Sequence, residues 1–99
     1  MTCNNCPHMW EKKFNADLQV LRSGYSKLNK AMKMTIDGYR KDFEEAKINY
    51  VSAAKAMLNC YLDGIYHSGV IKWEEKKELY LYATYDNKYM YCSPTKEGE

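Results

Sequence analysis

The residues most suited to chemistry lie at the start of the chain, where Cys3 and Cys6 form a CxxC pair and His8 follows. Thiolate and imidazole are ligands that zinc prefers, and a structural zinc site needs four of them. No second CxxC or HxxxH motif supplies the remaining zinc ligands. The four ligands would therefore have to be Cys3, Cys6 and Cys60 with either His8 or His67. We expect no cofactor, with reduced thiols and Cys60 in the core, and we keep a zinc site on Cys3, Cys6, His8 and Cys60 as the alternative.

The remaining candidates for catalysis do not form a set. Cys60 and His67 are seven residues apart on a predicted helix, roughly 10 Å along its axis, whereas a nucleophile and its base must lie about 3 Å apart. We interpret the clustered acidic residues as helix-capping and solvated positions: Glu44, Glu45, Glu74, Glu75 and Glu78. The sequence also lacks a Gly-rich phosphate loop and an HExxH motif. We therefore expect a protein that is not an enzyme.

Two groups of side chains are candidates for contact with a partner. The basic group is Lys12, Arg22, Lys30 and Lys33, which share one face of a predicted helix. The aromatic group is Tyr80, Tyr82, Tyr85, Tyr89 and Tyr91, which are too dense for one small core to bury completely. Lysines on a solvated face need no partner, but the two groups together would also suit an anionic partner or stacked bases.

The composition of the chain indicates one small folded domain. With 99 residues and a net charge of +2, we expect a single domain over residues 1–92 and a disordered polar tail over 93–99. The basic excess lies in the first third, where six Lys and Arg face two Asp and Glu up to Thr35. No apolar run approaches the roughly 20 residues that span a bilayer, and no apolar signal segment follows Met1. We expect a cytoplasmic protein that does not enter a membrane.

The helices that must position these residues follow from the spacing of apolar residues. One helix is predicted from Pro7, with Asn5 or Cys6 at its cap, to about Met34. Its apolar stripe is Trp10, Phe14, Leu18, Leu21, Tyr25, Leu28 and Met32. A second is predicted over residues 37–66, and its apolar residues fall on two adjoining arcs. The first arc is Tyr39, Phe43, Ala46, Tyr50, Ala53, Ala54, Met57, Cys60 and Tyr61; the second arc is Val51, Leu58, Leu62 and Ile65. Two arcs imply two different neighbours, so this should be the central helix.

The predicted fold is an all-α, three-helix protein built on a long antiparallel helical hairpin. The hairpin turns at residues 35–38, where Asp37-Gly38 is a turn signal, and a shorter third helix runs from Trp73 to about Thr84 before an irregular Tyr-rich segment. A β-hairpin over residues 79–91 is the alternative for that segment. The alternative for the whole fold is one continuous helix of about 85 Å that forms a coiled-coil oligomer.

These features favour a function in binding. We expect a small non-catalytic interaction protein that acts by stoichiometric binding of a protein partner and forms a homo-oligomer. Small chains without a catalytic set are often inhibitors or modulators of a host factor that are encoded by phages or mobile elements. This expectation rests on the size of the chain and on the absence of other signals. The alternative is a nucleic-acid- or nucleotide-binding module, stabilised by zinc, that uses the basic and aromatic groups.

Overall fold

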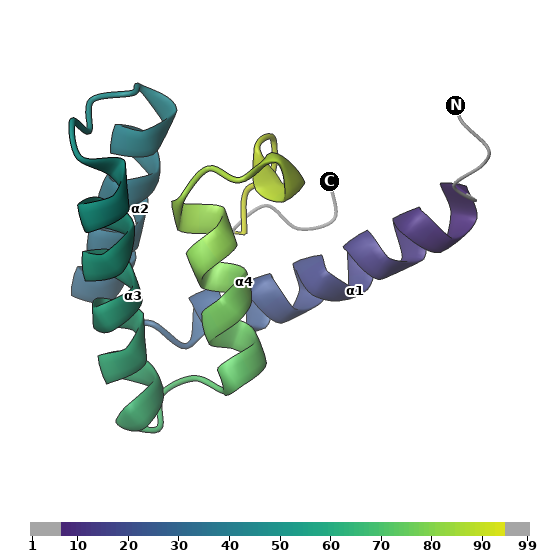
Figure 1. Cartoon of the computed structure of the whole chain (residues 1–99). Helices are drawn as coiled ribbons and strands as arrows, with labels where there is room; N and C mark the ends of the chain where they lie inside the picture. Colours follow the sequence, from purple (N-terminus) through teal and green to yellow (C-terminus); the bar gives the residue numbers. More distant parts are fainter. Residues whose placement is uncertain (1–6, 95–99) are drawn as a thin grey trace.

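Four α-helices form the part of the chain that the computed structural model describes, which is the backbone of residues 7–94 and the side chains of residues 13 and 15–94. They are α1 (Pro7–Ser26), α2 (Lys30–Glu44), α3 (Val51–His67) and α4 (Trp73–Ala83), followed by the short 3-10 helix η1 (Asn87–Tyr89). No strand occurs among these residues, so the all-α prediction is confirmed. Figure 1 shows α2, α3 and α4 beside one another, with the start of α1 extending away from them.

The predicted long hairpin is wrong, because the first helix ends earlier than its apolar stripe suggests. α1 stops at Ser26 and α2 begins at Lys30, where the side chain of Asn29 accepts a hydrogen bond of 2.8 Å from the backbone N–H of Met32. An asparagine in this position satisfies one of the free N–H groups of a new helix. α1 and α2 consequently run in different directions rather than antiparallel (Figure 1), and neither the three-helix hairpin nor the continuous coiled-coil helix is formed.

The predicted turn at residues 35–38 lies inside α2. The chain instead reverses after Glu44, where Ala46 takes a left-handed conformation with φ 54° and the N–H of Lys47 reaches back to the carbonyl of Asp42 at 3.0 Å. This arrangement closes a helix, and glycine usually occupies its left-handed position. An alanine there gives no turn signal in the sequence, whereas Asp37-Gly38 does.

α4 is the central helix of the fold, in place of the predicted helix over residues 37–66. It contacts α1, α2, α3 and η1, and its contact with α1 is the most extensive. The core around it contains Leu21, Tyr25, Leu28, Ile36, Leu58, Leu62, Ile65, Ile71, Leu79, Tyr82, Ala83 and Tyr89. α4 ends at Ala83 and η1 follows, so a helix to about Thr84 is confirmed and the β-hairpin is not formed.

Two acidic residues of α4 are buried, which explains why the sequence did not identify this helix as central. Glu75 accepts hydrogen bonds from Ser23 Oγ at 2.6 Å, from Lys27 Nζ at 2.8 and 2.9 Å, and from the backbone N–H of Lys72 at 2.7 Å. Burial alone would raise the pKa of Glu75, but these hydrogen bonds outweigh it and hold that pKa below its ordinary value. Glu78 is also buried and accepts from Tyr89 Oη and Lys88 Nζ.

α1 crosses α4 closely at Gly24, and this contact gives a prediction for a matched pair of glycines. A Cβ atom on Gly24 would lie 2.8 Å from Cβ of Glu75, whereas nothing lies within 4 Å of a Cβ on Gly38 in α2. We expect Gly24→Ala to lower the free energy of unfolding by about 1–3 kcal/mol through overpacking. We expect Gly38→Ala to raise it by about 0.5–1 kcal/mol, because alanine favours a helix interior. Urea denaturation of both variants tests this, and equal stabilities would contradict the close crossing.

Candidate functional site

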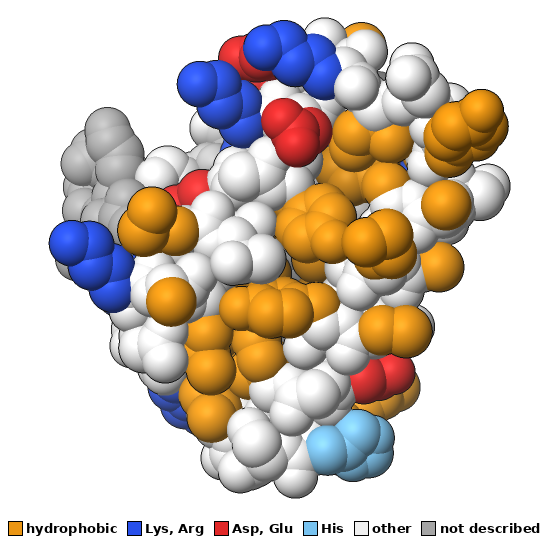
Figure 2. All heavy atoms as spheres, turned by 90° about the vertical axis from the view of Figure 1, so that its left-hand side faces the viewer, with side chains coloured by type: hydrophobic (Ala, Val, Ile, Leu, Met, Phe, Trp, Pro, Cys, Tyr) orange, Lys and Arg blue, Asp and Glu red, His pale blue; other side chains and the backbone are white. Residues whose placement is uncertain are grey.

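Large apolar side chains are exposed mainly on α2 and α3. In the described part of the chain, four of the six exposed large hydrophobic residues belong to these helices or to the turn between them: Met34, Tyr50, Val51 and Met57. The side chains of Tyr50 and Met57 are 77% and 63% exposed. Figure 2 shows hydrophobic side chains gathered along the α2–α3 boundary, with acidic and basic side chains at its margins. Exposed apolar side chains that gather in this way mark interaction sites.

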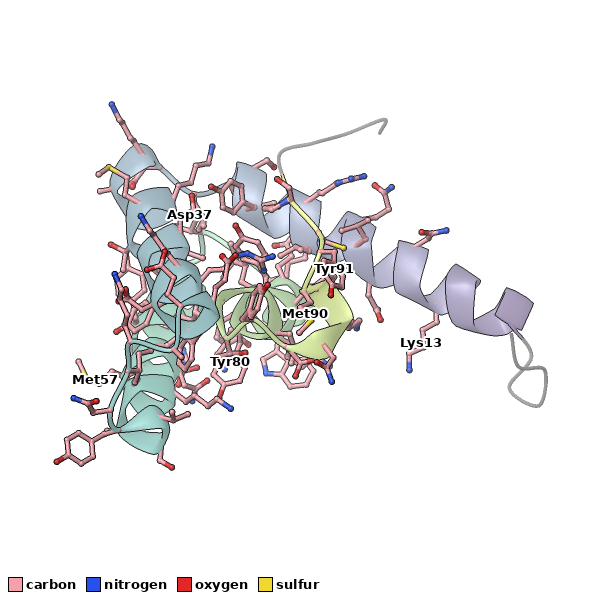
Figure 3. The ribbon with its side chains drawn as sticks, turned by 90° about the horizontal axis from the view of Figure 1, so that it is seen from above. Lys13, Asp37, Met57, Tyr80, Met90 and Tyr91 are labelled. Atoms are coloured by element: carbon pink, nitrogen blue, oxygen red, sulfur yellow. The ribbon has the colours of Figure 1, made fainter. Side chains whose placement is uncertain are left out.

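The two predicted arcs of α3 explain this exposure. Leu58, Leu62 and Ile65 of the second arc are buried against the rest of the core, as the two-neighbour argument predicted, although Val51 at the start of the arc is exposed. Met57 and Cys60 of the first arc point outward, and Figure 3 shows Met57 on the side of α3 that faces away from α4. Among the described residues α3 packs on α4 and lies beside α2, and Met57 and Cys60 of the first arc remain uncovered.

A shallow groove of about 540 Å³ runs between the two helices beside the first arc. It is lined by Tyr39 of α2 and by Ala56, Met57, Cys60 and Tyr61 of α3. We use the name α2–α3 face for these five residues together with Tyr50 and Ala53. The seven residues include no Asp, Glu, Lys or Arg, so an apolar occupant would cover the face without burying a charge.

A polar network behind α2 fixes the position of that helix. Asp37 accepts hydrogen bonds from Tyr25 Oη at 2.7 Å and from Tyr82 Oη at 2.9 Å, and the two rings meet edge to face at 6.1 Å. Burial, followed by the nearby carboxylate of Asp37, raises the pKa of both tyrosines well above the ordinary value, so both hydroxyls remain donors. α1, α2 and α4 are thereby joined through one side chain of α2.

Arg40, one turn after Asp37, holds the end of the described chain against α2. Its guanidinium donates to the carbonyl oxygens of Tyr82, Tyr89, Met90 and Cys92 at 2.9 to 3.2 Å. The same group lies 4.3 Å from the centre of the Tyr82 ring and 5.1 Å from that of Tyr85. Nothing in the local sequence indicates this contact, because it joins residues more than 40 positions apart.

The predicted aromatic group divides into buried and exposed members. Tyr82 and Tyr89 lie in the core, and burial beside Glu78 raises the pKa of Tyr89. Tyr80 and Tyr85 are half-buried, and Tyr80 lines a pocket of about 290 Å³ between α3 and α4. Only Tyr91 of this group is largely exposed, at 92%. These placements leave Tyr91 as the most accessible of the five for a partner.

The predicted basic group is divided between two helices. Arg22 is on α1 and half-buried, Lys30 and Lys33 are on α2, and the side chain of Lys12 lies outside the described residues. Lys30 is exposed, whereas Nζ of Lys33 lies 5.4 Å from the centre of the Tyr25 ring. The break between α1 and α2 therefore removes the single helical face on which these residues were predicted to lie.

The predicted zinc ligands are only partly described. Cys3, Cys6 and the side chain of His8 lie outside the described residues, while Cys60 is exposed on α3 rather than in the core. No group of three or more His, Cys, Asp and Glu side chains suited to a metal occurs in the described part. Figures 1 and 3 both place the start of α1 far from α3, so the hairpin that would have brought these ligands together is missing.

No known protein family, curated protein or solved structure matches the chain. Among the described residues, no helix is both long and apolar enough to cross a membrane.

Proposed function

We propose that this protein is a small non-catalytic interaction protein that acts by stoichiometric binding of another protein on the α2–α3 face. The observation that supports the proposal is the exposure of Tyr50 and Met57 beside an apolar groove. A helix that lies in a groove and buries its apolar side chains there is a common mode of peptide and protein recognition. The occupant would be an amphipathic helix.

The face has the physical properties that such binding requires. Full burial of a methionine side chain contributes roughly 1.5–3 kcal/mol, and tyrosine is frequent among residues that dominate binding energy. The face is also rigid, since Leu58 and Leu62 hold α3 in the core with exposures of 0%. A preformed face avoids the entropic cost of ordering a flexible segment on binding.

We further propose that the bound protein is a host factor, which this chain inhibits or modulates, and that the chain is encoded by a phage or mobile element. The identity of the bound protein decides this part of the proposal. The nucleic-acid or nucleotide alternative remains the competing proposal, with Lys30 and Tyr91 as its exposed members. Salt distinguishes the two. A phosphate-dominated contact weakens steeply between low and physiological salt, whereas an apolar protein contact changes little.

Affinity capture with a matched pair of variants tests the proposal. The full chain is immobilised as wild type, as Met57→Glu, which places a charge on the face, and as Ser52→Glu, which places the same charge elsewhere on α3. We expect wild type and Ser52→Glu to retain the same protein, and Met57→Glu to lose it, at low and physiological salt. The retained protein is then purified and titrated calorimetrically to obtain its stoichiometry.

The control for folding is the thermal unfolding midpoint, which should be similar in the three proteins because both substituted positions are exposed. Equal binding of the purified protein by wild type and Met57→Glu would contradict a role of the α2–α3 face. Retention of nucleic acid that disappears with salt would support the alternative.

A further inference from the structure

We infer that the occupant of the α2–α3 face in the isolated protein is a second copy of this chain, bound with the two α3 helices antiparallel. The inference rests on the proposed function in one respect, namely that this face is a binding surface. It goes further by naming the partner and the register in which the two helices meet.

The exposed residues of α3 have a spacing that suits a second helix. Six residues recur at alternating intervals of three and four from the turn before α3 to its last residue: Tyr50, Ala53, Met57, Cys60, Gly64 and His67. All six are exposed. Alternation of three and four is the pattern by which two helices pack side by side along a continuous line. We call these six residues the α3 seam.

The α3 seam is also complementary to itself. In a symmetric dimer the same surface of each copy must fit the other. When two such seams are aligned antiparallel about a point between residues 58 and 59, Met57 lies opposite Cys60 of the partner copy. Ala53 then lies opposite Gly64 of the partner copy, and Tyr50 opposite its His67. The large side chain of Met57 meets a smaller one, and the Ala53–Gly64 pairs let the helices approach closely.

The area of the face also suits a dimer. α3 has 17 residues. At 1.5 Å per residue and about 10 Å per helix diameter, a face formed by α3 and α2 projects to roughly 25 by 20 Å. Two such faces cover roughly 1,000 Å² together, which reaches the lower limit for a specific interface between proteins. No Asp, Glu, Lys or Arg lies on the α3 seam. Contact with a second copy would therefore leave no unpaired charge of the seam buried in the interface.

Sedimentation of the full chain at micromolar concentration tests for the second copy. We expect wild type and Ser52→Glu to sediment as dimers, and Met57→Glu to sediment as a monomer. The carboxylates introduced by Met57→Glu would lie in the apolar interface, and we expect the dissociation constant to rise by about 100-fold or more. Met57→Glu should keep the helical circular dichroism of wild type, since its side chain is outside the core.

A cysteine variant tests the antiparallel register. Met57→Cys, mixed as unlabelled and nitrogen-15-labelled chains and oxidised mildly with diamide, should give a dimer in which the new thiol is linked to Cys60 of the other copy. Ser52→Cys, treated in the same way, should not give a link to Cys60. Mass analysis of the digest identifies the linked peptides and, from the labels, whether they come from two chains.

The outcomes separate this inference from the proposed function. A wild-type monomer at micromolar concentration would overturn the inference, and the proposed function would stand if Met57→Glu still abolished binding of a captured protein. A dimer that survives Met57→Glu, or that lacks the link to Cys60, would overturn the arrangement on the α3 seam. A monomer whose partner binding is also unaffected by Met57→Glu would overturn both.

Discussion

Replacement of Leu58 or Leu62 by alanine should lower the free energy of unfolding by about 2–5 kcal/mol in each case. Both side chains are 0% exposed and lie on the inner side of α3, within the core that surrounds α4. Truncation removes buried methyl groups and leaves a cavity that the neighbouring helices can fill only in part. Urea denaturation followed by far-ultraviolet circular dichroism measures the loss directly.

The control for these variants is Lys30→Ala, at an exposed position near the start of α2. It should change the free energy of unfolding by no more than about 0.5 kcal/mol. If Leu58→Ala and Leu62→Ala were as stable as Lys30→Ala, the second arc, which contains these leucines, would have to face solvent. The first arc would then have to be buried in place of the second, so its assignment as a binding face would fail as well.

Replacement of Asp37 by alanine should have a comparable effect for a different reason. The variant leaves the hydroxyls of Tyr25 and Tyr82, both in buried side chains, without their acceptor. A buried polar group that loses its partner costs about 1–3 kcal/mol, so the two together predict a loss of about 2–5 kcal/mol. Asp42→Ala, at an exposed position on the same helix, should change stability by about 0.5 kcal/mol or less.

A rescue experiment distinguishes lost hydrogen bonds from a general disturbance of α2. Tyr25→Phe and Tyr82→Phe, added to Asp37→Ala, remove the two donors that lack an acceptor, and most of the lost stability should return. The same two phenylalanine changes in the presence of Asp37 should be destabilising, since they leave the carboxylate without its donors. Failure of the combined variant to recover would show that Asp37 stabilises the fold by another route.

The sequence predicted those features that depend on a single helix. The all-α class, the end of α4 near Thr84 and the burial of Leu58, Leu62 and Ile65 all follow from local periodicity, and all three are found. The positions of the turns could not be predicted in this way. Asn29 gives a weak cap signal within a continuous apolar stripe, and Ala46 takes a left-handed conformation without being glycine.

The central place of α4 was missed because its burial depends on distant partners. Glu75 and Glu78 in a short, polar helix indicate a solvated surface until Ser23, Lys27, Lys88 and Tyr89 are placed around them. Only part of the α2–α3 face could be predicted. Two arcs on one helix indicated two neighbours, but periodicity cannot show which arc the rest of the chain covers, and the tyrosines with the highest local density proved to be partly core.

The order of the helices along the chain has a consequence for biosynthesis. α1, α2 and α3 all pack on α4, and α4 follows them in sequence, so each leaves the ribosome before its common neighbour has been made. The contact between Ser23 and Glu75 spans 52 positions, and all four carbonyls held by Arg40 belong to Tyr82 or later residues. A nascent chain therefore carries three helices with uncovered apolar faces until α4 is translated, and we expect it to be open to chaperones and to aggregation in this interval.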